Sequence, residues 1–181
     1  AAQNFMTAPK GMEPGVNEWG AWTPPAPTFP NGCHAVEVEI EPETGKLAIV
    51  RYAAVDDVGT VINPLLMEGQ LHGGIVQGVG QIVMENVMWD RSSGQLVAGS
   101  FMDYAMPRAD DLPSFELEIN EVPTPTNPMG VKGAGEAGCV GAMPAVMNAI
   151  VDALASVGVC TLDMPASPER IWRAIQAADV E

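Results

Sequence analysis

The part of the sequence best equipped for chemistry is a glycine-rich run around Glu136, which reads GVKGAGEAG from Gly130 to Gly138. Closely spaced glycines let backbone N–H groups converge on an anion, and Lys132 adds a positive charge beside them. The carboxylate of Glu136 could accept a proton as a general base. On composition alone, the alternative is a solvated glutamate in a loop whose glycines only make turns.

The same run, from Gly133 to Gly138, formally matches the GxGxxG fingerprint of dinucleotide-binding proteins. That motif should leave a buried parallel strand and open directly into a helix, with an acidic residue at the end of a second strand about 20 residues later. Here the polar segment PTPTNPMG comes first, and no such acidic residue follows. A nicotinamide-binding domain is therefore disfavoured.

Strict alternation near residue 35 predicts the first element that must support this loop. In AVEVEIE, residues 35–41, Val36, Val38 and Ile40 fall on one face of a half-buried strand. The turn EPETGK leads into a more continuously apolar run, residues 47–55, which we expect to be the more buried partner of the hairpin.

A long helix is predicted from Pro64 to about Val87. Its glutamines Gln70, Gln77 and Gln81 share one side with Gly74, while Leu71, Ile75, Val79 and Ile82 gather on the other. Each glycine costs a helix roughly 1 kcal/mol relative to alanine. The five glycines between Gly69 and Gly80 therefore indicate that something approaches this backbone closely, and another helix would suffice.

Downstream, DRSSGQ, residues 90–95, predicts a turn, and residues 96–108 are expected to continue as an extended apolar stretch. FELEINEV then alternates as a strand, with Phe115, Leu117 and Ile119 on one face. The loop that follows, from Pro123 to Pro144, is too long for an idle connection in a compact domain, which suggests a function.

Two helices should close the chain. Pro144 suits the first turn of one helix, which Gly158 ends. Ser167 caps the other, with Pro168 at its first position. The order of elements predicts an α+β fold, with an irregular segment over residues 1–30, a domain over 31–176 and a tail over 177–181.

Composition narrows the function classes. The chain has 8 basic and 23 acidic residues, a formal charge of −15, which disfavours binding to nucleic acid or anionic lipid. No run of about 18 to 20 apolar residues suggests a membrane span. Cys33, Cys139 and Cys160 fit no metal-binding spacing, so reduced thiols in a cytoplasmic protein are expected. The start at Ala1 suggests a piece of a longer chain or a matured subunit.

The run NPMGVKGAGEAGCVGAMPAVMNAIVDAL resembles the segment that carries the active-site glutamate in molybdenum hydroxylases of the xanthine oxidase family. The blocks NGCHAVEVEIEPETGKLAIVRYAAVDDVGTVINP, GQLHGGIVQGVGQ and GSFMDYAMPRADDLP resemble other parts of the large subunits, especially in the branch with carbon monoxide dehydrogenase and aldehyde-oxidising relatives. The resemblance covers roughly residues 22–175. It implies the C-terminal part of the second molybdopterin-binding domain.

The resemblance implies an enzyme that hydroxylates an electron-poor carbon, in an aldehyde, an N-heterocycle or carbon monoxide, with water as the oxygen source. Glu136 would be its catalytic base, and Gln77 would contact the pterin. Lys132 is a further candidate for cofactor binding, and no residue is assigned as a metal ligand. The backbone expected beside the cofactor belongs to Gly133, Ala134 and Gly135.

The implied cofactor is molybdenum-molybdopterin in its cytosine dinucleotide form. [2Fe–2S] clusters and FAD would belong to partner chains, since this chain has neither a cysteine array nor a nucleotide fold for them. The implied partners are the remaining part of the molybdenum subunit, an iron–sulfur subunit, a flavin subunit and a small-molecule substrate. The alternative is a noncatalytic molybdopterin-binding or assembly module, which would not need Glu136.

Four other residues with reactive side chains are expected to have structural roles. His72 has no second ligand nearby in sequence, so a structural role is expected. Cys139 follows the glutamate by three residues, but no histidine lies near it in sequence to activate it, and packing is expected. Asp103 and Tyr104 are expected to hold their loop.

Overall fold

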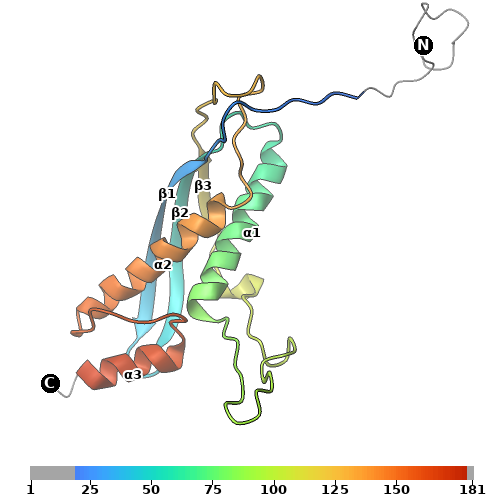
Figure 1. Ribbon diagram of the computed structural model, residues 1–181. Coiled ribbons are helices and arrows are strands. Elements are labelled where there is room, and N and C mark those ends of the chain that lie inside the picture. Colours follow the sequence, from blue (N-terminus) through green and yellow to red (C-terminus); the bar gives the residue numbers. More distant parts are fainter. Residues whose placement is uncertain (1–18, 179–181) are drawn as a thin grey trace, which may run out of the picture.

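The computed structural model describes residues 19–178, in which a mixed three-stranded sheet is covered on one face by helices (Figure 1). The strands are β1 (Asn31–Glu41), β2 (Lys46–Asp57) and β3 (Phe115–Ile119), in the order β1-β2-β3. β1 and β2 are antiparallel, and β2 and β3 are parallel. The α+β prediction is confirmed. Residues 19–30 of the expected irregular segment contain no helix or strand, and the rest of that segment lies outside the described residues.

The predicted hairpin is confirmed, with Gly45 at φ +70° in its turn. A bulge between Glu37 and Val38 leaves Val50 of β2 without a partner. One extra residue reverses which side chains face inward. Leu47 is therefore half-buried before the bulge, and Tyr52 is fully buried after it. As predicted, β2 is the more buried strand, because it also carries the buried Ala54, Asp56 and Asp57.

The predicted long helix is α1 (Pro64–Val83), which begins where expected. The side chain of Asn63 caps it by accepting a hydrogen bond from the Leu66 N–H at 3.2 Å. The predicted end near Val87 is wrong by four residues. The N–H groups of Met84 and Glu85 both bond to the Gly80 carbonyl, at 3.0 and 2.8 Å, which turns the chain away from the helix axis.

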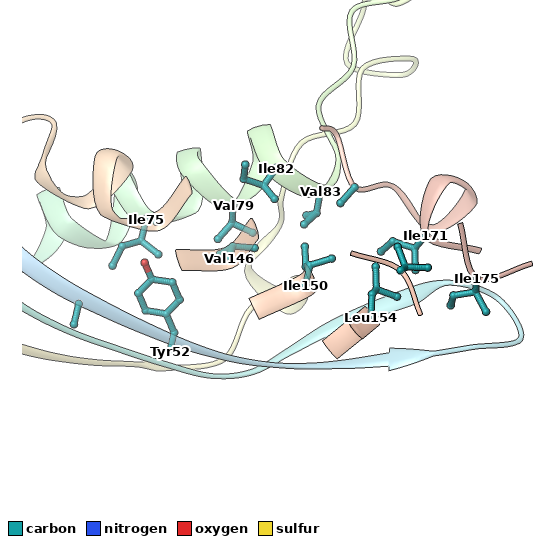
Figure 2. Close-up of a cluster of buried hydrophobic side chains, with 14 residues drawn as sticks. Tyr52, Ile75, Val79, Ile82, Val83, Val146, Ile150, Leu154, Ile171 and Ile175 are labelled. Atoms are coloured by element: carbon teal, nitrogen blue, oxygen red, sulfur yellow. The ribbon is translucent and has the colours of Figure 1, made fainter. Parts of the chain in front are cut away.

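The core lies between the sheet and two helices, α1 and α2 (Ala137–Ala155) (Figure 2). The predicted apolar side of α1 is buried there. The predicted amide side is exposed at Gln70, Gln77 and Gln81 but not at Gly74, which is buried against α2. The larger side chains of this core cluster are labelled in Figure 2, and they are Tyr52, Ile75, Val79, Ile82, Val83, Val146, Ile150, Leu154, Ile171 and Ile175.

Glycines let the two helices touch backbone to backbone. A Cβ added to Gly74 would lie 3.0 Å from the Cys139 nitrogen, and one added to Gly138 would lie 2.7 Å from the Leu71 carbonyl oxygen. Gly78 similarly faces Ala142. The expectation that another helix approaches this backbone is confirmed for these positions. Added Cβ atoms at Gly69 and Gly73 would meet nothing within 4 Å, so another reason is needed there.

Pro144 was predicted to lie in the first turn of a helix. Instead it lies inside α2. The helix begins earlier because Gly138 and Ala142 allow its first turns to pack on α1. A proline here removes the hydrogen bond to the carbonyl of Val140, a residue that is 61% exposed. Solvent can therefore replace the lost donor. α2 also has the length and hydropathy of a membrane-spanning helix, yet its buried stripe packs on α1 and the sheet.

Residues 96–108 are not the extended stretch that was predicted. Within them, Ser100 closes a turn by accepting the N–H groups of Asp103 and Tyr104 at 3.1 and 2.8 Å. A single bridge joins Trp89 to Leu96, and a short 3₁₀ helix spans Ala109–Asp111. In Figure 1, residues 84–108 extend away from the sheet beyond the end of α1. They leave large apolar side chains exposed, among them Val87, Trp89, Phe101 and Met102.

The last helix, α3 (Pro168–Ala178), begins as predicted. The Arg170 N–H lies 3.4 Å from the Ser167 hydroxyl oxygen, which caps it. Ile171 and Ile175 bury its inner side in the same core.

Candidate active site

Glu136 lies where the glycine-rich loop enters α2, at the N-cap position. Its side chain is exposed and makes no capping hydrogen bond, so the carboxylate is free to act on another molecule. The amide Nε2 of Gln70 donates to the carbonyl of Gly135 at 3.0 Å. This bond ties the exposed amide side of α1 to the residue directly before Glu136.

The backbone before Glu136 is accessible. Added Cβ atoms at Gly133 and Gly135 would meet nothing within 4 Å. No hydrogen bond between described residues uses the backbone N–H of Gly133, Ala134 or Gly135. Three successive free N–H groups in an exposed loop can donate hydrogen bonds to an anionic or carbonyl-bearing ligand.

Lys132 fixes the start of this loop. Its N–H bonds to the Val58 carbonyl at 2.9 Å, and its ammonium forms an ion pair with Asp57 in which each side chain is 11% exposed. Asp57 also accepts the N–H groups of Gly59 and Val122, at 2.8 and 3.1 Å. Burial raises the pKa of Asp57, but the hydrogen bond from Lys132 and those from the backbone outweigh it and lower the pKa to about 2.

Gln77 lies on the same exposed side of α1 as Gln70, two helical turns further along. Its side chain makes no hydrogen bond with the described residues. The open position of Gly73 lies between the two glutamines on this side. The structure thus places Gln70 against the loop and leaves the carboxamide of Gln77, with one acceptor and two donor hydrogens, unengaged.

Glu136 also lines a cavity of about 520 Å³ between α2 and the start of β1, large enough for a small molecule. Its walls include Phe29 and Pro30 before β1, and Val140 and Pro144 on α2. Besides Glu136, the polar side chains that line it are those of Asn31, His34, Asp56 and Asn148.

His34, Asp56 and Tyr52 form a buried cluster that sequence reasoning missed. The Tyr52 hydroxyl lies 2.6 Å from His34 Nδ1, and His34 Nε2 lies 3.4 Å from the Asp56 carboxylate. Burial, and then the negative charge of Asp56, raise the pKa of Tyr52. The signal was available, because His34 shares the alternation of Val36 in β1 and therefore faces inward.

The four residues for which structural roles were expected make contacts within the fold. The ring of His72 meets Phe115 edge to face, with centroids 5.3 Å apart. The Cys139 backbone packs against Gly74. Tyr104 donates to Glu85 Oε2 at 2.6 Å, and Asp103 Oδ2 accepts the Ser100 hydroxyl at 2.7 Å.

Comparison with known proteins points to one family. Residues 1–113 match the molybdopterin cofactor-binding domain. The chain is 42% identical to the nicotine 6-hydroxylase large subunit of Paenarthrobacter nicotinovorans over 92% of this chain and 20% of that protein. It is 38% identical to the carbon monoxide dehydrogenase large chain of Hydrogenophaga pseudoflava over 97% of this chain and 22% of that one.

Solved structures agree. Carbon monoxide dehydrogenase from Oligotropha carboxidovorans superposes with a TM-score of 0.88 at 32% identity, over 98% of this chain and 22% of that one. Quinoline 2-oxidoreductase from Pseudomonas putida 86 gives 0.75 at 43% identity, over 79% of this chain and 18% of that one. The chain spans about a fifth of the length of the relatives it matches. It belongs to the molybdopterin cofactor-binding domain family, and its fold is that of the corresponding part of the carbon monoxide dehydrogenase large subunit.

Proposed function

We propose that this chain forms one wall of the molybdenum-cofactor site of a hydroxylase, with Glu136 as the catalytic base. The enzyme would hydroxylate an electron-poor carbon with oxygen from water. The observation that carries the proposal is the placement of Glu136. Its carboxylate is uncommitted at the N-cap of α2, beside a cavity, and it directly follows three unpaired backbone donors.

The chain's donor set fits a pterin cofactor. A pterin edge alternates hydrogen-bond donors and acceptors, and the free carboxamide of Gln77 offers both. The N–H groups of Gly133, Ala134 and Gly135 offer donors without side chains in the way. The open positions at Gly69 and Gly73 let a flat ligand or a second chain approach the amide side of α1. When bound, molybdenum-molybdopterin would supply the water-derived oxygen and take up two electrons.

The chain's own residues would hold and move the proton that water gives up in the reaction. Glu136 would accept it on a carboxylate oxygen and later release it to solvent. Lys132 would serve the cofactor site through the loop that it anchors, since its ammonium is committed to Asp57. Gln70 would keep the loop against α1 through Gly135. General-base chemistry depends on such positioning, because the acceptor must lie within hydrogen-bond reach of the proton.

The rest of the site would come from other segments and chains. Two relatives are named as a large subunit or large chain, and another is subunit gamma of a dehydrogenase complex. Together with the exposed apolar side chains of residues 84–108, these names support a complex with further chains. We take those chains to be the remaining part of the molybdenum subunit and iron–sulfur and flavin subunits, and the complex to be cytoplasmic. The cytosine dinucleotide form of the cofactor belongs to the same proposal.

Glu136→Gln tests the proposal in the assembled enzyme. Glutamine keeps the volume but removes the proton acceptor, so molybdenum should stay bound while enzyme reduction by substrate slows by about a hundred- to ten-thousand-fold. Glu39→Gln, on an exposed face of β1, is the matched control and should change neither quantity. Near wild-type reduction by Glu136→Gln at full metal content would remove Glu136 from the chemistry and favour a noncatalytic binding module.

A further inference from the structure

The buried cluster beneath the cavity links the sheet to the helix that carries Glu136. His34 and Asp56 have side chains only 3% exposed, and Tyr52 is fully buried. All three lie on the sheet face that α2 covers. Buried polar groups at this depth are costly unless they are paired. Their retention on the inner face of β1 and β2 therefore calls for a reason beyond packing.

The direction of the hydrogen bonds follows from Asp56, whose carboxylate can only accept. The His34 N–H that faces it at 3.4 Å is therefore on Nε2. His34 Nδ1 is left to accept from the Tyr52 hydroxyl at 2.6 Å. The chain of bonds runs from Tyr52 through His34 to Asp56. It fixes the orientation of the imidazole ring.

Two glycines leave the space for this series of hydrogen bonds. A Cβ added to Gly141 of α2 would lie 2.5 Å from His34 ring atoms, and one added to Gly32 would lie 2.1 Å from Asp56 Oδ1. His34 therefore rests directly on the backbone of α2. Gly141 is five residues beyond Glu136 on the same helix.

The cluster also faces the cavity that Glu136 lines. His34, Asp56 and Glu136 all belong to its wall. Asp56 Oδ2 is buried without a hydrogen-bond partner among the described residues. Buried oxygens are normally paired, so an unpaired one beside a cavity is a position where a ligand could complete the bond.

We propose that His34 is a positioning residue for Glu136, holding the first turns of α2 through its contact at Gly141 while Tyr52 and Asp56 lock its ring. The proposal rests on the proposed role of Glu136 as the base. A reacting group displaced by about 1 Å can lose about 100-fold in rate. The signature of His34 is thus a fall in kcat with little change in KM.

His34→Phe tests this in the assembled enzyme, because it keeps a ring against α2 but removes both hydrogen bonds. We expect kcat to fall by about 100-fold at full molybdenum content with KM nearly unchanged. His34→Gln can still accept from Tyr52 and donate to Asp56, and should recover much of the lost rate. His72→Phe is the matched control, since His72 lies on α1 against Phe115 and should leave kcat unchanged.

Three outcomes would overturn the proposal: an unchanged kcat in His34→Phe, a loss that simply follows missing molybdenum, or no recovery in His34→Gln. If His34→Phe does not assemble, Gly141→Ala decides, because its new methyl group must push the His34 ring aside. An unchanged kcat in Gly141→Ala would also overturn it. Loss of activity in Glu136→Gln alongside normal His34 variants would refute only this inference, whereas an active Glu136→Gln would refute the proposed function itself.

Discussion

Replacing Lys132 with methionine should loosen the loop that leads to Glu136 while keeping most of the hydrocarbon stem. The change leaves Asp57 buried without its cation. Removing one partner of a buried ion pair typically costs about 3 to 5 kcal/mol. Asp57 keeps the two backbone donors of Gly59 and Val122, so the lower end, about 3 kcal/mol, is expected.

Amide hydrogen exchange in the assembled enzyme measures this local opening. The informative amides are those of Lys132 and Thr124, which bond to the carbonyls of Val58 and Gly130 at 2.9 and 3.1 Å. A cost of about 3 kcal/mol corresponds to about 100-fold faster exchange, since about 1.4 kcal/mol is a factor of ten. Arg51→Met is the matched control, because the Arg51–Glu116 pair is exposed, with side chains 63% and 57% accessible. Exposed pairs contribute little.

Two results would refute this reasoning. Exchange in Lys132→Met that stays at the wild-type rate would mean that the ion pair does not hold the loop. Equal acceleration in Arg51→Met would mean that the effect comes from a lost charge in an acidic chain and not from the buried contact.

Two further predictions follow from the site. Gln77→Ala should lower the molybdenum content of the purified enzyme, whereas Gln95→Ala, outside α1, should not, and full occupancy in Gln77→Ala would exclude it from the cofactor site. Because the folded pKa of Asp57 is about 2 against an ordinary 3.8, its ionised form stabilises the fold above about pH 4 and loses that effect as the pH falls toward 2. The difference in thermal midpoint between wild type and Lys132→Met should therefore shrink over that range, and a constant difference would contradict the pairing.

The periodicity of the sequence predicted most of the fold. Alternation placed Val36 and Ile40 on the inner side of β1, and helical spacing placed Ile75 and Val79 in the core, because one buried face decides both patterns. Prediction from the sequence failed where tertiary contacts override the local preferences of residues. Pro144 normally marks a helix start, yet the contact of Gly138 with α1 extends α2 past it.

The candidate site was predicted only in part. The loop and Glu136 stood out because glycines beside a carboxylate are a local pattern. The ion pair between Asp57 and Lys132 joins residues 75 positions apart, and the cluster of His34 and Asp56 joins neighbouring strands, so neither appears within one sequence window. The bulge at Val50 added to the difficulty, because it changes which residues of β2 face inward.

The backbone contact between Gly74 and Gly138 has a consequence for engineering this enzyme class. Gly138 lies two residues after Glu136, and Gly74 lies three residues before Gln77. The contact therefore couples the position of the proposed base to that of the proposed cofactor contact. A redesign that enlarges a side chain at this crossing would shift both at once. The outer wall of the cavity, at Val140 and Asn148, offers positions where bulk can be varied while the crossing keeps its spacing.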